Sequence, residues 1–413
     1  TFKLYTNIFI TSFPNYIKMY AIFKFICYNK FNSKKGGADV LNFRNGRFRL
    51  MQITDIQDTQ FTSEDTVDFI RAALEKEKPD LVVLTGDQVK SYGFSIALGS
   101  KEKNIEKAIR NILALFEEKE IPFTFLYGNH DVPKKSGDYD FQTDIYESSP
   151  CCVNKEAFAR YKRTDSVCIP IYSENGEKAL LALYMIDNCS KLPGGGNGVH
   201  PDQMDWMDET DSAISAMNNG EKVPSLVFQH IPVYEMYELL DEVPKGTDGA
   251  IEGNRRKRGH FYKITDEMKL RGEFMGECVS CPGTPSEQFE RWVKMGNIAG
   301  AYFGHDHNNC FTGNLRGISL GYTPGAGFNA YGPDLKRGVR IFDFDESSQG
   351  FETRMVFYKD ILGNKVHNEI KRYIYNNAPS SFSAAKPLIY KGAACIAGVG
   401  ALIAGAVIHK KSR

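Results

Sequence analysis

Short apolar segments of this chain end, one after another, in polar or ionisable residues. The segments that end in this way lie at 48–53, 81–84, 123–127, 225–228 and 299–303. Between the first three, apolar residues recur with helical spacing in 63–78 and 104–119. Strands that alternate with helices form right-handed βαβ units in a largely parallel sheet, and the carboxyl ends of parallel strands share one edge. The pattern therefore predicts an α/β fold with a ligand site along that edge.

The residues at these strand ends are carboxylates, carboxamides and imidazoles. In chain order they are Asp55, Gln57, Asp87, Asn129, His130, Asp131, His230, His305 and His307. Any one of them alone is typical of a turn, a helix cap or a core histidine. Together they offer the mixed nitrogen and oxygen donors that suit Mn, Fe or Zn. A carboxylate that bridges two such ions would hold a phosphoryl group and a nucleophilic hydroxide together, so the series predicts a two-metal site.

The ordered series resembles the calcineurin-like metallophosphoesterase superfamily, whose motifs are D-x-H, G-D, G-N-H-[DE], H and G-H-x-H. The matching stretches here are 55–57, 86–87, 128–131, 230 and 304–307. Their flanks, and residues 317–340, are similar to the single-domain branch that includes the purple acid phosphatase 29-like proteins. The resemblance covers about residues 47–358 and implies a four-layer sandwich, with two mixed β-sheets flanked by helices.

The resemblance also implies a role for each residue of the series. Asp87 would bridge the two metals. The first metal would be held by Asp55, Gln57 and His307, and the second by Asn129, His230 and His305. His130 would lie beside the scissile phosphate as general acid or charge stabiliser. Asp131 would orient His130 by accepting its other N–H.

Two positions depart from the pattern of that superfamily. Gln57 stands where the first motif has histidine, and a neutral amide oxygen is a weaker donor than a ring nitrogen. The first metal is therefore expected to bind loosely. Lys90 stands where the purple branch has tyrosine, so no iron–tyrosinate chromophore is expected.

The predicted activity is that of a dinuclear metal-dependent phosphatase, which hydrolyses phosphomonoesters, including phosphoproteins, by in-line attack of a metal-bound hydroxide. A phosphodiesterase or nuclease on the same site is an alternative that the basic run 255–258 favours. The 51 basic and 51 acidic residues cancel, so no nucleic-acid partner is expected. A third hypothesis is a catalytically weak, membrane-bound scaffold, because Gln57 replaces the usual histidine.

The segments outside the catalytic domain at 47–358 differ in character. Residues 1–46 are an undecided leader and linker, and residues 359–391 are a second linker. Residues 392–408 carry no charge, have the length of a short transmembrane helix and precede a basic tail at 409–413. The C-terminus is therefore expected to anchor the protein in an endomembrane, with the domain on the cytosolic or the luminal face. The sequon at Asn188 would carry a glycan only on the luminal face.

Overall fold

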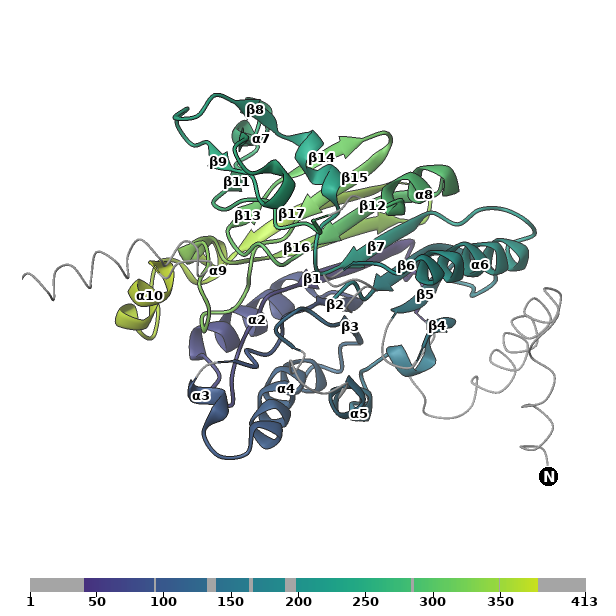
Figure 1. Cartoon of the computed structure of the whole chain (residues 1–413). Helices are drawn as coiled ribbons and strands as arrows, with labels where there is room; N and C mark the ends of the chain where they lie inside the picture. The colour runs from purple at the N-terminus through teal and green to yellow at the C-terminus, as the bar shows by residue number, and fades with distance from the viewer. Residues whose placement is uncertain are drawn as a thin grey trace, which may run out of the picture.

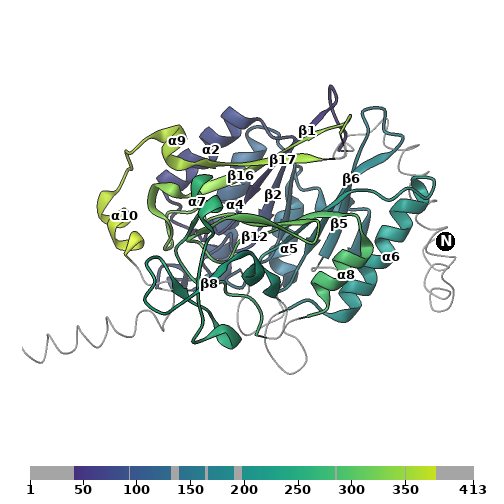
Figure 2. The same cartoon turned by 90° about the horizontal axis from the view of Figure 1, so that it is seen from above.

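The computed structural model of the chain describes residues 41–92, 94–131, 139–162, 166–189, 198–283, 286–348 and 350–377. Two β-sheets pack face to face, and helices cover both outer faces (Figures 1 and 2). The resemblance to the superfamily predicts this arrangement, and the described residues confirm a mixed α/β fold. Most of the predicted leader and the predicted membrane segment at 392–408 lie outside the described residues.

The first sheet has five strands in the spatial order β17-β16-β1-β2-β3. Their bounds are Phe351–Phe357, Gly338–Asp345, Arg47–Ile53, Leu81–Thr85 and Phe123–Leu126, respectively. β1, β2 and β3 are parallel, whereas β16 is antiparallel to both of its neighbours. The helices α2 (Glu64–Glu77) and α4 (Lys101–Glu117) connect the parallel strands, as the helical spacing predicts.

The second sheet has seven strands in the order β14-β15-β12-β7-β6-β5-β4. Their bounds are Thr312–Leu315, Ile318–Tyr322, Ile298–Phe303, Ser225–Gln229, Ala179–Ile186, Ser166–Tyr172 and Ala159–Tyr161. The three central pairings, which join β15, β12, β7 and β6, are parallel, and the strands at both ends are antiparallel. The largely parallel sheet expected from βαβ units is thus wrong for the outer strands. Short connections join consecutive strands there, and such connections allow only antiparallel pairing.

Three apolar clusters show how the layers are stacked. Leu50 and Val83 face the second sheet and meet Leu183 and Phe228 between the two sheets. Met51 belongs instead to the cluster under the outer helices, because successive side chains of a strand point to opposite faces. That cluster includes α2, α4 and α5 (Tyr139–Ser148), and α6 (Pro201–Met217) and α8 (Gln288–Met295) cover the second sheet.

Two regions between the strands named in the sequence pattern contain further structure. The region 131–178 holds α5, β4 and β5, and 241–282 holds a three-stranded sheet. That small sheet consists of β8 (Asp241–Val243), β10 (Phe261–Lys263) and β9 (Ile251–Glu252). It lies with α7 (Asp266–Leu270) beyond β14 and β15 (Figure 1). The remaining short elements are α3 (Phe94–Ala97), β11 (Phe274–Met275), β13 (Asn309–Cys310), α9 (Tyr358–Leu362) and α10 (Glu369–Asn376). Within the described ranges, no helix has the length and apolar character to cross a membrane.

Candidate metal centre

The predicted series converges at the seam between the two sheets. Asp55, Asp87 and Asn129 follow β1, β2 and β3 of the first sheet. In the second sheet, His230 follows β7, and His305 and His307 follow β12. Asp55, Gln57, Asp87 and His305 all have positive φ angles, of 52°, 40°, 54° and 74°. Non-glycine residues adopt this conformation rarely, and such residues cluster at functional sites, where the fold holds them in place.

The loops pack so closely that glycine is required beside the ligands. Gly86 has a φ angle of 93°, and a Cβ atom there would lie 2.6 Å from Nδ1 of His230. A Cβ atom on Gly325 would lie 3.1 Å from Cγ of His307. The glycine before Asp87 therefore allows loops from the two sheets to approach each other.

Asp55, Asp87 and His307 form the first potential metal position. All three are buried, and one ligand atom from each lies within 4.8 Å of the others. Nδ1 of His307 donates a hydrogen bond to the Tyr331 carbonyl at 2.7 Å, and the two rings stack at 4.2 Å. This bond leaves Nε2 of a neutral imidazole free to bind a metal, 3.2 Å from Oδ1 of Asp55. That carboxylate oxygen is buried and accepts no hydrogen bond from the described residues.

Asp87, Asn129, His230 and His305, the residues that the resemblance implies for the second metal, lie near one another. Nε2 of His230 lies 3.3 Å from Oδ2 of Asp87 and 3.2 Å from Oδ1 of Asn129. The His305 ring meets the His230 ring edge-on at 5.0 Å. Nδ1 of His230 donates to the Thr85 carbonyl at 3.0 Å, so Nε2 is again the nitrogen that faces the site.

Gln57 lies at the first position, but its amide nitrogen faces the ligands. Nε2 is 2.9 Å from Oδ2 of Asp87 and 3.1 Å from Nε2 of His307. Its carbonyl oxygen points away and accepts a hydrogen bond from the Tyr92 hydroxyl at 3.1 Å. In this orientation the carboxamide presents hydrogen-bond donors, not an oxygen ligand, to the metal position.

His130 lies at the rim of the centre. Its side chain is 38% exposed, and Nε2 lies 3.9 Å from Oδ2 of Asp87. The ring packs against Tyr92 with a centroid distance of 4.6 Å. This is the position that a group acting on a bound substrate needs, because it is open to solvent and beside the ligands.

Asp131 connects the loop after β3 to the loop after β2 by hydrogen bonds. Its buried carboxylate accepts hydrogen bonds from the amides of Gly128 (2.8 Å), Asp87 (2.7 Å) and Val89 (2.8 Å). These bonds join the loop after β3 to the loop after β2. The resemblance implies that Asp131 also orients the His130 imidazole, and the three main-chain hydrogen bonds hold the loop that carries His130.

Comparison with known proteins shows which family this chain belongs to. The family model for calcineurin-like phosphoesterases matches residues 48–309, which include every predicted ligand. The chain belongs to the calcineurin-like phosphoesterase family. It is therefore assigned to the metal-dependent phosphoric ester hydrolases, and the family implies divalent metal ions at this centre.

The relatives of this phosphoesterase include two proteins of Arabidopsis thaliana. One is named probable inactive purple acid phosphatase 28 and is 24% identical over 360 residues, covering 77% of this chain and 80% of that protein. The other is named probable inactive purple acid phosphatase 14 and is 26% identical over 337 residues, with coverages of 72% and 75%. A dimetal phosphatase from Danio rerio superposes with a TM-score of 0.41 at 10% identity, covering 75% of this chain and 99% of that one.

The donor set of the phosphoesterase centre fits metal ions. Burial lowers the pKa of the His230 imidazole, but Asp87 and Asp55 outweigh this effect and raise the pKa to about 10. Burial and the neighbouring His230 lower the pKa of His305 to about 3. A divalent ion stabilises the same carboxylates that hold the proton on His230, so metal binding is expected to replace this proton.

Residues that sequence reasoning missed support the ligands. Tyr92 and Tyr331 bind Gln57 and His307, and neither follows a predicted strand. Asn188 does follow a strand, but the sequence suggests only a glycan acceptor. In the structure it is 1% exposed and bonds to both the carbonyl (2.6 Å) and the amide (3.1 Å) of Ile231, next to His230. The carboxamide of Asn188 is thus buried and hydrogen-bonded to the main chain in the folded domain.

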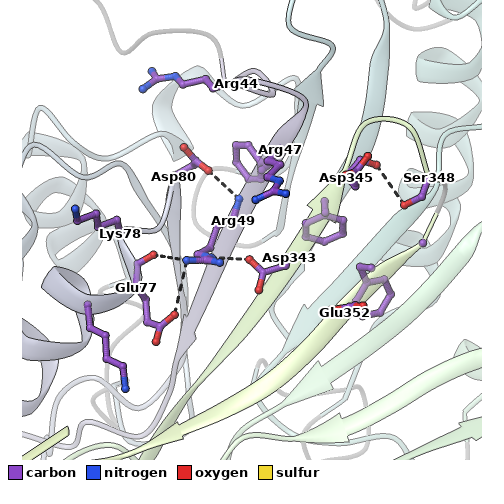
Figure 3. Close-up of a pocket in the computed structure, with 15 residues that line it drawn as sticks. Arg44, Arg47, Arg49, Glu77, Lys78, Asp80, Asp343, Asp345, Ser348 and Glu352 are labelled. Carbon is purple, nitrogen blue, oxygen red and sulfur yellow. Dashed lines mark hydrogen bonds and ion pairs between the residues drawn. The ribbon is translucent and has the colours of Figure 1, made fainter.

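A separate cavity of about 880 Å³ lies at the opposite edge of the first sheet, near the start of β1 (Figure 3). Arg49 lies at its centre and bonds to Oδ1 of Asp343 at 2.5 Å and to the Glu77 carbonyl at 2.8 Å. The Arg49 amide donates to Asp80 at 2.8 Å. Several of the acids here are thus engaged by Arg49, and the cavity is separated from the metal centre by the length of β1.

Proposed function

We propose that this phosphoesterase hydrolyses phosphomonoesters at the seam between its two sheets. The observation that carries the proposal is the convergence of Asp55, Asp87 and His307 within 4.8 Å, with the partly exposed side chain of His130 beside them. When bound, two divalent ions supply a nucleophile from water and neutralise the charge on the phosphoryl oxygens. Mn, Fe and Zn are the ions that the nitrogen and oxygen donors suit.

The side chains around the ions would have two roles, metal binding and contact with the substrate. Asp87 lies between the two positions, so its carboxylate can bind both ions. His130 faces the open side, where the ester would enter. Burial lowers the pKa of His130 in the free protein, and the charge of a bound phosphate raises it again. His130 can then donate a hydrogen bond to the phosphoryl group or a proton to the leaving group.

The test compares a phosphomonoester with a phosphodiester on the purified full chain. The protein is loaded with Mn²⁺, Zn²⁺ or Fe²⁺, its metal content is measured, and p-nitrophenyl phosphate and bis-p-nitrophenyl phosphate are assayed. A higher kcat/KM for the monoester supports the proposal, and a higher value for the diester overturns it in favour of a phosphodiesterase. The variant Asp87→Asn, which lacks the negative charge of the carboxylate at the centre, serves as the control for background hydrolysis.

A catalytically weak scaffold is the second candidate function. It is supported by the amide nitrogen of Gln57 at the first metal position, 2.9 Å from the Asp87 carboxylate. The two plant relatives are named as inactive, which is consistent with this alternative. Two ions bound without hydrolysis of either ester would support it.

We also propose that residues 392–408 anchor the protein in an internal membrane. The support is in the sequence, where an uncharged run of this length precedes the basic residues 409–413. The phosphorylated substrate would then be one that reaches the membrane surface.

A further inference from the structure

The carboxamide of Gln57 connects two groups that a first metal ion needs. Nε2 lies 2.9 Å from Oδ2 of Asp87 and 3.1 Å from Nε2 of His307. The side chain is buried, so these contacts are made without competition from bulk water. The amide group therefore lies between Asp87, the carboxylate predicted to bridge the two metals, and His307, an imidazole predicted to bind the first metal.

The neighbours determine which end of the amide faces the centre. Nδ1 of His307 donates to the Tyr331 carbonyl at 2.7 Å, so Nε2 is the ring nitrogen that faces Gln57. The Asp87 carboxylate can only accept a hydrogen bond, so it directs the donating end of the amide toward the centre. On the other side, the Tyr92 hydroxyl donates to Oε1 of Gln57 at 3.1 Å. Burial and the charge of Asp87 raise the pKa of Tyr92 to about 12, so this hydroxyl keeps its proton at neutral pH.

The first metal position is complete without Gln57. Asp55, Asp87 and His307 alone bring one ligand atom each within 4.8 Å of one another. Three protein ligands with a fourth position left for water or substrate are the arrangement of catalytic zinc sites. Removal of Gln57 would therefore leave a usable site.

We propose that Gln57 closes the first metal position and competes with the ion, and that Tyr92 is a positioning residue that holds Gln57 in this orientation. The inference rests on the proposed metal-dependent function, since it concerns the same centre. An ion that enters must break both hydrogen bonds from Nε2, and rotation of the amide must break the bond from Tyr92. Among the described residues, the hydrogen bonds of the Gln57 amide nitrogen reach Asp87 and His307 of the first position.

Replacement of Gln57 by alanine distinguishes whether Gln57 competes with the first ion or binds it. If Gln57 were a weak ligand, Gln57→Ala would weaken binding of the first ion. We expect the opposite, namely that the first-position Kd for Mn²⁺ falls about tenfold, since two ordinary hydrogen bonds no longer oppose the ion. Metal content and calorimetric titration give the stoichiometry, which should rise from one ion towards two at a fixed Mn²⁺ concentration. The spectrum of two coupled Mn²⁺ ions, absent from the wild type at that concentration, should appear as well.

Tyr92→Phe is the matched variant for the positioning role. It keeps the ring beside His130 and removes only the hydroxyl. We expect a smaller fall in the same Kd, of about two- to fivefold, because a single hydrogen bond is lost. In the Gln57→Ala background the same change should have no effect on the Kd, since no amide remains to be held.

The outcomes are distinguishable from a failure of the proposed function. A Kd that rises in Gln57→Ala, or a Tyr92→Phe effect of equal size in both backgrounds, overturns the inference. Both results are read from metal binding alone. Failure of the phosphatase proposal would instead appear as two bound ions without ester hydrolysis, whichever way the Kd moves.

Discussion

The Asp87 carboxylate connects most of the groups at the centre. Oδ1 accepts the His130 amide at 2.7 Å, and Oδ2 lies 3.3 Å from Nε2 of His230. Asp87→Asn keeps an oxygen for the His130 amide but removes the negative charge between two dications. We expect loss of bound metal and of activity, while the fold persists. Metal analysis and circular dichroism of the variant check this, and retention of both ions with full turnover would contradict the site.

His130 should behave differently because it is not among the ligands. His130→Ala is expected to keep its metal content near that of the wild type. The rate of phosphoryl transfer should fall by about 10²–10⁴-fold, the range for a lost acid–base group. The fall should be smaller for nitrophenolate, a leaving group that needs little protonation. Equal losses for good and poor leaving groups would show that His130 stabilises phosphoryl charge instead.

Single residues could be predicted where they directly follow a strand. Asp55, Asp87 and His230 lie where the strand ends place them, because parallel strands deliver their next residues to one edge. Tyr92 and Tyr331 could not be predicted in this way. Their contacts depend on how irregular loops fold back over the edge, and no sequence periodicity records such paths.

At the scale of elements, the loop between β15 and β16 depends on one buried cation. The Arg337 guanidinium donates to the carbonyls of Gly327 and Ala330, the latter at 2.8 Å, and lies 4.8 Å from the centre of the Phe328 ring. This loop carries Tyr331, which orients His307. Arg337 therefore connects the fold of the loop to the geometry of the metal position.

Arg337→Met should lower the free energy of unfolding by about 2–4 kcal/mol, because two buried carbonyls lose their donors. Urea denaturation measures this, and the first-position affinity for Mn²⁺ should fall as well. The control is Arg316→Met. Arg316 forms an ion pair with Glu290 at the surface, and the two side chains are 48% and 61% exposed, respectively. Loss of that surface pair should cost less than about 1 kcal/mol. Similar losses in both variants would refute the proposed role of Arg337.

Element boundaries were predictable where a pattern is long enough. The helices α2 and α4 follow the predicted ranges because each repeats its apolar face over several turns. The strands β8, β9 and β10 have two or three residues each, too few for an alternation to be recognised. The strand β15 was not recognised either, although it lies in the stretch that resembles the superfamily.

At the scale of the whole molecule, the sequence pattern alone predicted the parallel strands, and only the resemblance predicted two mixed sheets. The ligands are divided between those sheets, so an ion would cross-link them. Metal at about 100 times its Kd should stabilise the native state by about 2.7 kcal/mol per site. Thermal or urea unfolding with Mn²⁺ and with a chelator tests this. Asp87→Asn should show no such gain, and an equal gain in that variant would place the ion elsewhere.

The proposed anchor is tested on the full chain and on a reporter. Residues 386–413 should direct a reporter to membranes and resist extraction by high salt or alkaline carbonate, whereas a basic peripheral segment would be released by salt. Val399→Asp with Ile403→Asp should abolish insertion, at about 2.5–3.5 kcal/mol for each charge. Residues 1–385 should be soluble and active. Recovery of the full chain in the soluble fraction without detergent would refute the anchor.

The division of the ligands between two sheets also bears on how the protein is made. Asp55, Asp87 and Asn129 are synthesised early, whereas His305 and His307 are added much later. A nascent chain that ends before His305 holds only part of either ligand set, so it has no complete position to offer an ion. Metal loading at the proposed centre would then be a late step of biogenesis, and a ribosome-bound chain stalled before His305 should not retain an ion that the released protein binds.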